Sequence, residues 1–208
     1  FMFISISVES LHPLTTVFYR VLIGALILTL VVYAKGLKLP FTFNAWLAFM
    51  AMGIVGYVLP FFLISWGQLS VNSGIAGMIM ATMPLITMIL AHYLIDGENL
   101  NRYKILGFTF GISGIAVLLG PIFEGGGQAV YGGIAIFVAA ASYAVNTILV
   151  RRLPKLNPFI STSGVLIAST MMVFPIWLFV VPANTTEVST LVLSSTIWLG
   201  IGPTAIAT

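Results

Sequence analysis

Long apolar stretches separated by short polar segments follow one another along the whole chain. A transmembrane helix needs about 20 predominantly apolar residues, and each complete stretch reaches that length. The stretches are continuous, whereas the strands of a membrane barrel alternate apolar and polar positions. The pattern therefore predicts an all-α fold, a polytopic transmembrane helix bundle. The predicted helices cover residues 1–8, 14–33, 45–65, 73–95, 103–121, 131–150, 159–181 and 190–208.

The connections between these stretches are short and contain residues that end helices or carry charge. They include residues 35–40 (KGLKLP), 96–99 (DGEN), 121–128 (PIFEGGGQ) and 151–155 (RRLPK). The first and last apolar stretches run to the two ends of the chain. We therefore expect the sequence to be a fragment of a longer protein.

Composition supports the membrane assignment and narrows the function. Hydrophobic residues make up 60% of the chain and charged residues 6%, whereas soluble domains carry roughly 25% charged residues. So few charges cannot cover a water-exposed surface. The chain has no cysteine, two histidines and five acidic residues, so we expect neither a metal site nor any other cofactor.

The loop charges predict how the helices are oriented. Every second loop carries Lys or Arg, whereas the remaining loops, taken together, hold three acidic residues and no Lys or Arg. The positive-inside rule places the basic loops, including those with Lys35, Arg102 and Arg151, in the cytoplasm of a multi-pass cell-membrane protein. This distribution also argues against a nucleic-acid surface, despite the net charge of +3. The basic loop residues are Lys35, Lys38, Arg102, Lys104, Arg151, Arg152 and Lys155, and the acidic residues of the other loops are Glu9, Glu124 and Glu187.

Two short patterns recur five helices apart. Residues 10–14 (SLHPL) resemble 155–159 (KLNPF), and residues 46–48 (WLA) resemble 198–200 (WLG). Because the offset of five helices is odd, the second copy is inverted in the bilayer, which is typical of secondary transporters. We therefore assign residues 1–121 to a first five-helix repeat with a truncated first helix, and residues 131–208 to the incomplete start of a second.

Four short motifs follow one another across the fourth and fifth predicted helices: residues 83–85 (MPL), 95–98 (IDGE), Gly107 and 114–119 (GIAVLL). They resemble the end of the first repeat in the drug/metabolite transporter superfamily, EamA-type. The resemblance implies ten helices in two inverted five-helix repeats, with both termini cytoplasmic. It also implies export or exchange of small solutes such as amino acids, other metabolites and drugs.

Two further segments carry the same resemblance. Pro13 followed by Arg20 is similar to the family's second helix, and residues 139–144 (AAASYA) are similar to its sixth. Tyr143 stands there at a position where the family often has Trp. The predicted function is transport of a small organic solute across the cytoplasmic membrane by alternating access, in the direction of export.

Other functions remain as alternatives. A passive channel or a structural membrane subunit is disfavoured by the inverted repeat. A membrane-embedded lipid-modifying enzyme needs clustered His, Asp or Glu at one membrane face, and the sequence carries no such catalytic constellation, so we expect a non-enzyme. The expected partners are the small-molecule substrate and the lipid bilayer; a homodimer stays open.

Candidate substrate contacts are polar, aromatic or polarisable side chains at positions expected to face the bundle. Tyr57, Trp66 and Asn72 are expected around an outer vestibule, although belt and loop roles also fit them. Tyr143 and Asn146 share one helix face and serve either helix packing or a cavity. The full set is Arg20, Tyr57, Trp66, Asn72, Met80, Met83, Pro84, Tyr143 and Asn146.

Three of the proposed contacts surround an expected kink. Pro84 leaves the carbonyl of Met80 without its helical donor, and we expect a kink there near the bilayer midplane. Met80 and Met83 would supply adaptable walls, with lipid-facing filler as the alternative.

Charged residues near the helices need separate explanations. Arg20 lies inside a helix, where a central charge costs at least about 2.5–3.5 kcal/mol. It acts either as an anchor reaching the outer interface or as a substrate or gating contact. We interpret Glu98 as a cap for the helix that follows it, rather than as a proton relay.

Overall fold

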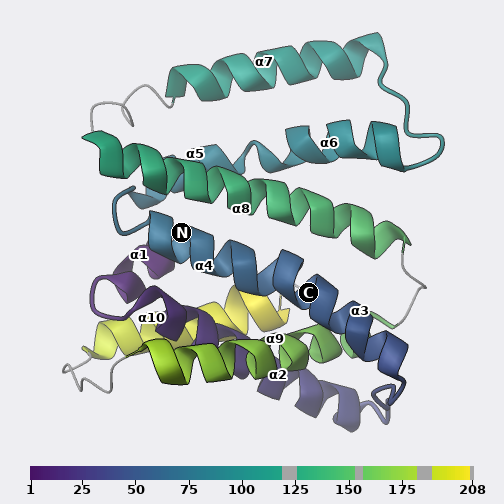
Figure 1. Cartoon of the computed structure of the whole chain (residues 1–208), viewed down its shortest axis with the longest axis vertical. Coiled ribbons are helices and arrows are strands. Elements are labelled where there is room, and N and C mark those ends of the chain that lie inside the picture. The colour runs from purple at the N-terminus through teal and green to yellow at the C-terminus, as the bar shows by residue number, and fades with distance from the viewer. Residues whose placement is uncertain (119–125, 153–156, 182–188, 207–208) are drawn as a thin grey trace. The chain divides into compact units, whose positions relative to one another are not determined.

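The structure is a computed structural model, and it describes residues 1–118, 126–152, 157–181 and 189–206. Every regular element in these ranges is helical, which confirms the predicted all-α fold (Figure 1). The elements in chain order are α1 (Met2–Val8), α2 (Pro13–Ala34), α3 (Phe43–Gly53), η1 (Ile54–Val58), α4 (Leu59–Gly67), α5 (Ser73–Met80), α6 (Met83–Leu94), α7 (Arg102–Leu118), α8 (Gly126–Arg152), α9 (Pro158–Val180), α10 (Thr190–Gly200) and η3 (Ile201–Ile206).

Five helical runs among the described residues are long and apolar enough to cross a membrane. Each overlaps a predicted crossing to within a few residues at most of its ends, and α8 begins five residues before the predicted 131. The last part of the predicted helix 103–121 lies outside the described residues. The five runs are Pro13–Ala34, Phe43–Gly67, Ser73–Leu94, Gly126–Arg151 and Pro158–Val180.

Two π-helical turns, η1 and η3, interrupt the helices that we predicted as single runs over 45–65 and 190–208. Pro60 follows η1 and has no N–H to donate to the carbonyl four residues earlier, at Gly56. A wider turn removes the clash between the proline ring and that carbonyl. Pro203 lies inside η3 itself.

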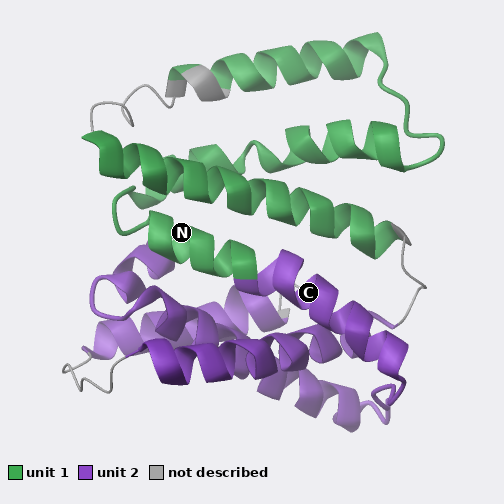
Figure 2. Cartoon of the chain, in the orientation of Figure 1, with its two compact units in different colours: residues 1, 59–153 green, residues 2–58, 154–208 purple. Residues whose placement is uncertain are grey.

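The chain forms two compact units (Figure 2). Unit 1 comprises Phe1 and Leu59–Leu153, and unit 2 comprises Met2–Val58 and Pro154–Thr208. Each unit combines helices from both predicted repeats. The two divisions differ because a compact unit consists of helices in contact, whereas a repeat is a continuous segment of the chain that resembles another segment. The repeat boundaries at 1–121 and 131–208 therefore stay a prediction.

Helices α2 and α9 form the core of unit 2. Near one end of the pair, Thr29 Oγ1 lies 2.9 Å from Ser163 Oγ. Near the other end, Phe18 stacks on Trp177 with ring centroids 4.7 Å apart, and Trp177 Nε1 donates to Thr15 Oγ1 at 3.1 Å. Residue numbers rise along α2 as they fall along α9, so the two helices are antiparallel.

The two helices of this pair begin with the same kind of cap. His12 Nδ1 accepts a hydrogen bond from Leu14 N at 3.2 Å, and Asn157 Oδ1 accepts one from Phe159 N at 3.0 Å. A proline occupies the first turn after each cap. The two turns that the sequence matched are thus built alike, at the N-termini of two antiparallel helices.

Glycines let the remaining helices of unit 2 approach this pair closely. A Cβ on Gly53 of α3 would lie 2.7 Å from Ser169 Oγ of α9, and a Cβ on Gly24 of α2 would lie 2.8 Å from Thr204 Cγ2 of η3. Both distances are shorter than a normal van der Waals contact. Each of the two membrane helices with a π-helical turn therefore meets the core pair through a glycine and a hydroxyl residue.

Unit 1 is organised around α8, which packs against α4, α5 and α6. Its buried side chains are mostly small, as at Ala139, Ala140 and Ala144, and small residues allow helices to approach one another closely. Helix α7 packs less extensively: a Cβ on its Gly111 would meet Leu85 of α6, while Gly107 has nothing within 4 Å of its Cβ position.

At the kink predicted before Pro84, the predicted helix 73–95 divides into two helices, separated by Ala81 and Thr82, whose backbone angles stay in the right-handed helical region. Helix α5 ends at Met80, and α6 begins at Met83 with Pro84 in its first turn. Thr82 Oγ1, between them, donates to Ile79 O at 2.7 Å. Thr82 N donates to the same Ile79 oxygen at 3.0 Å, so both donors of Thr82 bond the carbonyl that precedes Met80.

Candidate functional site

A pocket of about 370 Å³ lies in unit 1 beside the start of α6. Three elements and one loop form it: α6, the first turn of α7, the C-terminal end of α8, and the loop between α6 and α7. Its lining residues are Met83, Pro84, Thr87, Met88, Ala91, Glu98, Lys104, Thr147 and Arg151.

One wall of the pocket is apolar with two hydroxyls. Met83, Thr87 and Ala91 follow one another at four-residue intervals, which places them on one face of α6. Thr87 Oγ1 donates to Met83 O at 2.9 Å, and Thr147 Oγ1 of α8 donates to Tyr143 O at 2.9 Å. Each hydroxyl donates its hydrogen bond to a carbonyl of its own helix, and its oxygen can still accept a further hydrogen bond.

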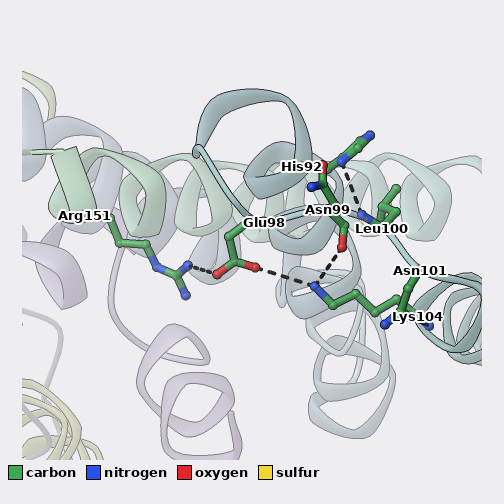
Figure 3. Close-up of polar contacts among 7 residues, drawn as sticks. All are labelled: His92, Glu98, Asn99, Leu100, Asn101, Lys104 and Arg151. Carbon is green, nitrogen blue, oxygen red and sulfur yellow. Dashed lines mark hydrogen bonds and ion pairs between the residues drawn. The ribbon is translucent and has the colours of Figure 1, made fainter.

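The other end of the pocket is ionic (Figure 3). The Glu98 carboxylate lies between two cations, with Oε1 3.2 Å from an Arg151 terminal nitrogen and Oε2 3.7 Å from Lys104 Nζ. Lys104 Nζ also donates to Asn99 O at 3.1 Å. The three charged side chains are 40–48% exposed, so a solute can reach them.

The loop that carries Glu98 is held at both ends. His92 Nδ1 accepts a hydrogen bond from Leu100 N at 3.3 Å, which ties the loop to the last turn of α6. Asn101 Oδ1 accepts one from Lys104 N at 2.8 Å, the pattern of a helix cap. The capping role that the sequence suggested for Glu98 thus belongs to Asn101, and the Glu98 carboxylate contacts side chains instead.

The structure brings Met83 and Pro84, two of the nine candidate residues, into this pocket. Met80 lies just before the break and packs against an apolar cluster that includes Val71 and Ile136. Of the expected methionine walls, Met83 therefore faces the pocket, and Met80 contributes to the packing of α5 on α8.

Tyr143 and Asn146 lie on α8 close to the pocket residue Thr147. The Tyr143 ring contacts Phe61 edge-on, with centroids 6.5 Å apart. Asn146 Oδ1 is buried and accepts no hydrogen bond from the residues that the structure describes. An unmet buried acceptor costs about 1–3 kcal/mol, and such a group is commonly satisfied by a water molecule or a bound ligand.

Trp66 and Asn72 do not line the pocket. Asn72 caps α5, since its Oδ1 accepts a hydrogen bond from Ile75 N at 2.9 Å. Trp66 is exposed near the end of α4, as expected of an aromatic belt residue. Asn72 therefore has a role in the loop before α5, and the belt and vestibule roles of Trp66 both stay predictions.

Arg20 and Tyr57 belong to unit 2. Arg20 is 9% exposed, and its Nε donates to Thr204 Oγ1 at 2.9 Å. The same hydroxyl donates to Leu199 O at 2.8 Å, so Arg20 is held inside the unit rather than reaching outward as an anchor. Tyr57, in η1, packs against the cluster around Phe49.

Unit 2 has a pocket of its own, of about 510 Å³, between α2 and α9. Its two threonines are Thr29, next to Ser163, and Thr170, which donates to Leu166 O. The remaining lining is apolar. The lining residues are Leu22, Ala25, Leu26, Thr29, Leu30, Ile167, Thr170, Met171 and Phe174.

Comparison with known proteins decides the family. A family model, that of the EamA-like transporter family, matches residues 1–120. The chain belongs to the EamA-like transporter family. With its several apolar spans, this EamA-like chain is a multi-pass membrane protein of a transporter family, and the resemblance drawn from the sequence is confirmed.

Two curated relatives of this EamA-like chain are both named uncharacterized transporters. YoaV of Bacillus subtilis is 24% identical over 141 residues, which cover 67% of this chain and 48% of YoaV. A transporter of Archaeoglobus fulgidus is 24% identical over 177 residues, which cover 83% of this chain and 60% of that protein. The chain thus spans about half the length of the curated relatives it matches.

A solved structure, described only as a protein crystal structure, shares the fold. It superposes with a TM-score of 0.72 at 21% sequence identity, over 97% of this chain and 70% of the other. At this identity the likeness shows the fold alone.

The sequence predicted two residues of the apolar wall of the unit 1 pocket, Met83 and Pro84, but not its hydroxyls or its ionic end. The methionine and proline at the break were recognised because proline in a helix is conspicuous. Thr87, Thr147 and the pairing of Glu98 with Arg151 were missed. The charge rule had placed Glu98 and Arg151 at one membrane face, and that shared face was the available signal for their pairing.

Proposed function

We propose that the protein carries a small organic solute, such as an amino acid, another metabolite or a drug, across the cytoplasmic membrane by alternating access, in the direction of export. The observation that carries the proposal is the pocket beside the interrupted helix α5–α6 in a chain of the EamA-like transporter family. Transporters commonly bind their solutes where a membrane helix is broken, because the freed backbone groups face a cavity.

Alternating access draws support from unit 2. Two inverted copies of one fold can exchange conformations, which opens a fixed site to one side and then to the other. The antiparallel pair α2–α9, with its matching caps, is the arrangement expected if the two copies exist. A passive channel has no need of such a pairing.

In the pocket we assign the solute contacts to Met83 and Pro84. We further propose contacts from Tyr143 and Asn146, which lie on α8 close to the lining residue Thr147. The free Asn146 Oδ1 would accept a hydrogen bond from the solute, and Met83 would adapt to its apolar part. For Arg20, Tyr57, Asn72 and Met80, a substrate role would have to replace contacts that these side chains already make. Trp66 is exposed and is not one of the residues that line this pocket.

The loop charges support an orientation in which the ionic end of the pocket faces the cytoplasm. Single cysteines placed at Lys38 and at Glu9 test it in cells, since the chain has no native cysteine. A membrane-impermeant maleimide added outside should label Glu9→Cys and leave Lys38→Cys unlabelled. Labelling of Lys38→Cys alone would show that the protein has the opposite orientation.

The function itself is tested by uptake and efflux in liposomes that contain the full-length protein. The assay uses a panel of amino acids and drugs, with and without a pH gradient. We expect saturable flux of at least one solute, accelerated when the same solute is present on the opposite side. Absence of flux for every solute would overturn the proposal, and flux without this acceleration would favour a channel.

A further inference from the structure

The charges at the end of the unit 1 pocket do not balance. Lys104 and Arg151 supply two positive charges, and Glu98 supplies one negative charge. We propose that this pocket binds a monoanionic amphiphile, an apolar solute with a single carboxylate, held by Arg151 and Lys104. The inference rests on the proposed function, because it names the solute class for the same pocket.

The cations have donors left for such a carboxylate. A guanidinium carries five N–H donors in a planar fork that matches a carboxylate, and the structure pairs one Arg151 nitrogen with one oxygen of Glu98. The Lys104 ammonium divides its donors between Asn99 O at 3.1 Å and a Glu98 oxygen at 3.7 Å. The longer of these contacts is a weak one.

Charge arithmetic separates the classes of solute. A monoanion brings the cluster of Glu98, Lys104 and Arg151 to neutrality. With a bound zwitterion the net charge of the cluster stays at +1, and with a bound cation it rises to +2. Because the three side chains are only partly exposed, their charges are screened less than those of fully solvated groups. The pocket should therefore prefer the monoanion over both.

The walls determine the rest of the solute. Met83, Pro84, Met88 and Ala91 present apolar surface, and methionine adapts to varied shapes. A volume of about 370 Å³ falls at the lower end of small-molecule sites. A compact apolar body with one charged end suits this lining better than a sugar or a nucleotide.

Glu98 already makes the contacts that a solute carboxylate would make. A bound carboxylate therefore shares Arg151 and Lys104 with Glu98, and the two negative charges repel each other. Removing the Glu98 charge should strengthen anion binding, whereas a merely structural ion pair would give no gain. This expected gain distinguishes a binding role from a structural one.

The probes are benzoate, its neutral analogue benzamide, and benzylammonium. Each is titrated calorimetrically into the chain in phosphatidylcholine nanodiscs at low salt. We expect benzoate to bind about tenfold or more tightly than benzamide, benzylammonium not to bind, and added salt to weaken benzoate binding. Equal binding of benzoate and benzamide would overturn the proposal.

Variants assign the effect to the pocket. Arg151→Gln should weaken benzoate binding about tenfold or more, and Glu98→Gln should strengthen it severalfold. Arg102→Gln is the matched control, because Arg102 lies in the same basic region, is exposed and does not line the pocket; it should change affinity less than twofold. If Arg151→Gln does not fold, Lys104→Gln takes its place. Weaker binding in Glu98→Gln, or equal losses in the Arg102 and Arg151 variants, would contradict the proposal.

The liposome assay separates this inference from the proposed function. Flux of uncharged or cationic solutes that survives Arg151→Gln, together with absent benzoate binding, would refute the anion site and leave the transporter standing. Charge-selective benzoate binding without any flux would support the anion site and refute the transporter.

Discussion

The α2–α9 pair of unit 2 and the α5–α6 run of unit 1 are both apolar enough to cross a membrane, yet they are built for different purposes. The pair is continuous, its rings stack, and its glycines admit neighbouring helices. The run is broken before Pro84, and along its second half, α6, Ala91 is the residue that the structure buries. Hydropathy alone does not separate the two regions, and neither does the presence of proline, because α9 stays continuous with Pro175 inside it. The difference is the interruption before Pro84.

The two pockets make the same contrast. The unit 2 pocket is larger, about 510 Å³ against about 370 Å³, but its lining is almost wholly apolar. The unit 1 pocket combines an apolar wall with hydroxyls and charges that converge at one end. Convergent polar groups in an apolar pocket are the usual mark of a ligand site, so size is the poorer guide here.

The largest expected effect on stability comes from filling a tight contact in unit 2. A Cβ on Gly164 would overlap the Phe49 ring, so Gly164→Ala should lower the free energy of unfolding by about 1–3 kcal/mol. Gly107→Ala in α7 is the control, with nothing within 4 Å of the Cβ position. Unfolding by SDS titration in mixed micelles measures both. If both variants lost a similar free energy of unfolding, the packing around Gly164 in unit 2 would be no tighter than that around Gly107 in unit 1.

The next effect concerns the buried arginine of unit 2. Thr204→Val removes the acceptor of the Arg20 Nε bond, and the loss should be about 1–3 kcal/mol because a buried hydrogen bond to a charged group is removed. Thr109→Val is the control, since Thr109 is exposed and bonds its own helix at Ile105 O. The same titration applies, and an unchanged Thr204→Val protein would show that the bond contributes nothing.

A smaller effect is expected at the ionic end of unit 1. The charged groups around Glu98 are 40–48% exposed, and exposed ion pairs contribute about 0.2–1 kcal/mol. Glu98→Gln should therefore lower the free energy of unfolding by no more than this amount, and less at high salt. A loss as large as that of Gly164→Ala would make the cluster a structural element.

The smallest change in stability should accompany a change in function. Pro84→Ala restores an N–H for the Met80 carbonyl and allows α5 and α6 to join. We expect stability within about 0.5 kcal/mol of the original or higher, and solute flux that falls severalfold. Flux at the original level in a folded Pro84→Ala protein would show that the interruption is dispensable.

Much of this architecture was accessible from the sequence. Apolar runs predicted the all-α bundle because lipid requires every spanning segment to satisfy its own backbone, and Pro84 predicted a disturbance in the α5–α6 run. The π-helical turns were not predicted, because they adjust the backbone to Pro60 and Pro203 without any change in hydropathy. The partners of Arg20 and Glu98 depend on tertiary contacts, and residues such as Thr204 carry no sequence mark of that role.

The central claim is that the solute site lies in unit 1 and that the larger pocket of unit 2 is not a solute site. Thr87 and Thr170 are matched probes, because each lines one pocket and each donates to a carbonyl four residues back in its own helix. Thr87→Cys and Thr170→Cys give single thiols in a chain without cysteine, and only a thiolate reached by water reacts readily. A water-soluble maleimide should label Thr87→Cys, a transported solute should slow that labelling, and Thr170→Cys should stay largely unlabelled. Solute protection at Thr170→Cys, with none at Thr87→Cys, would contradict the account.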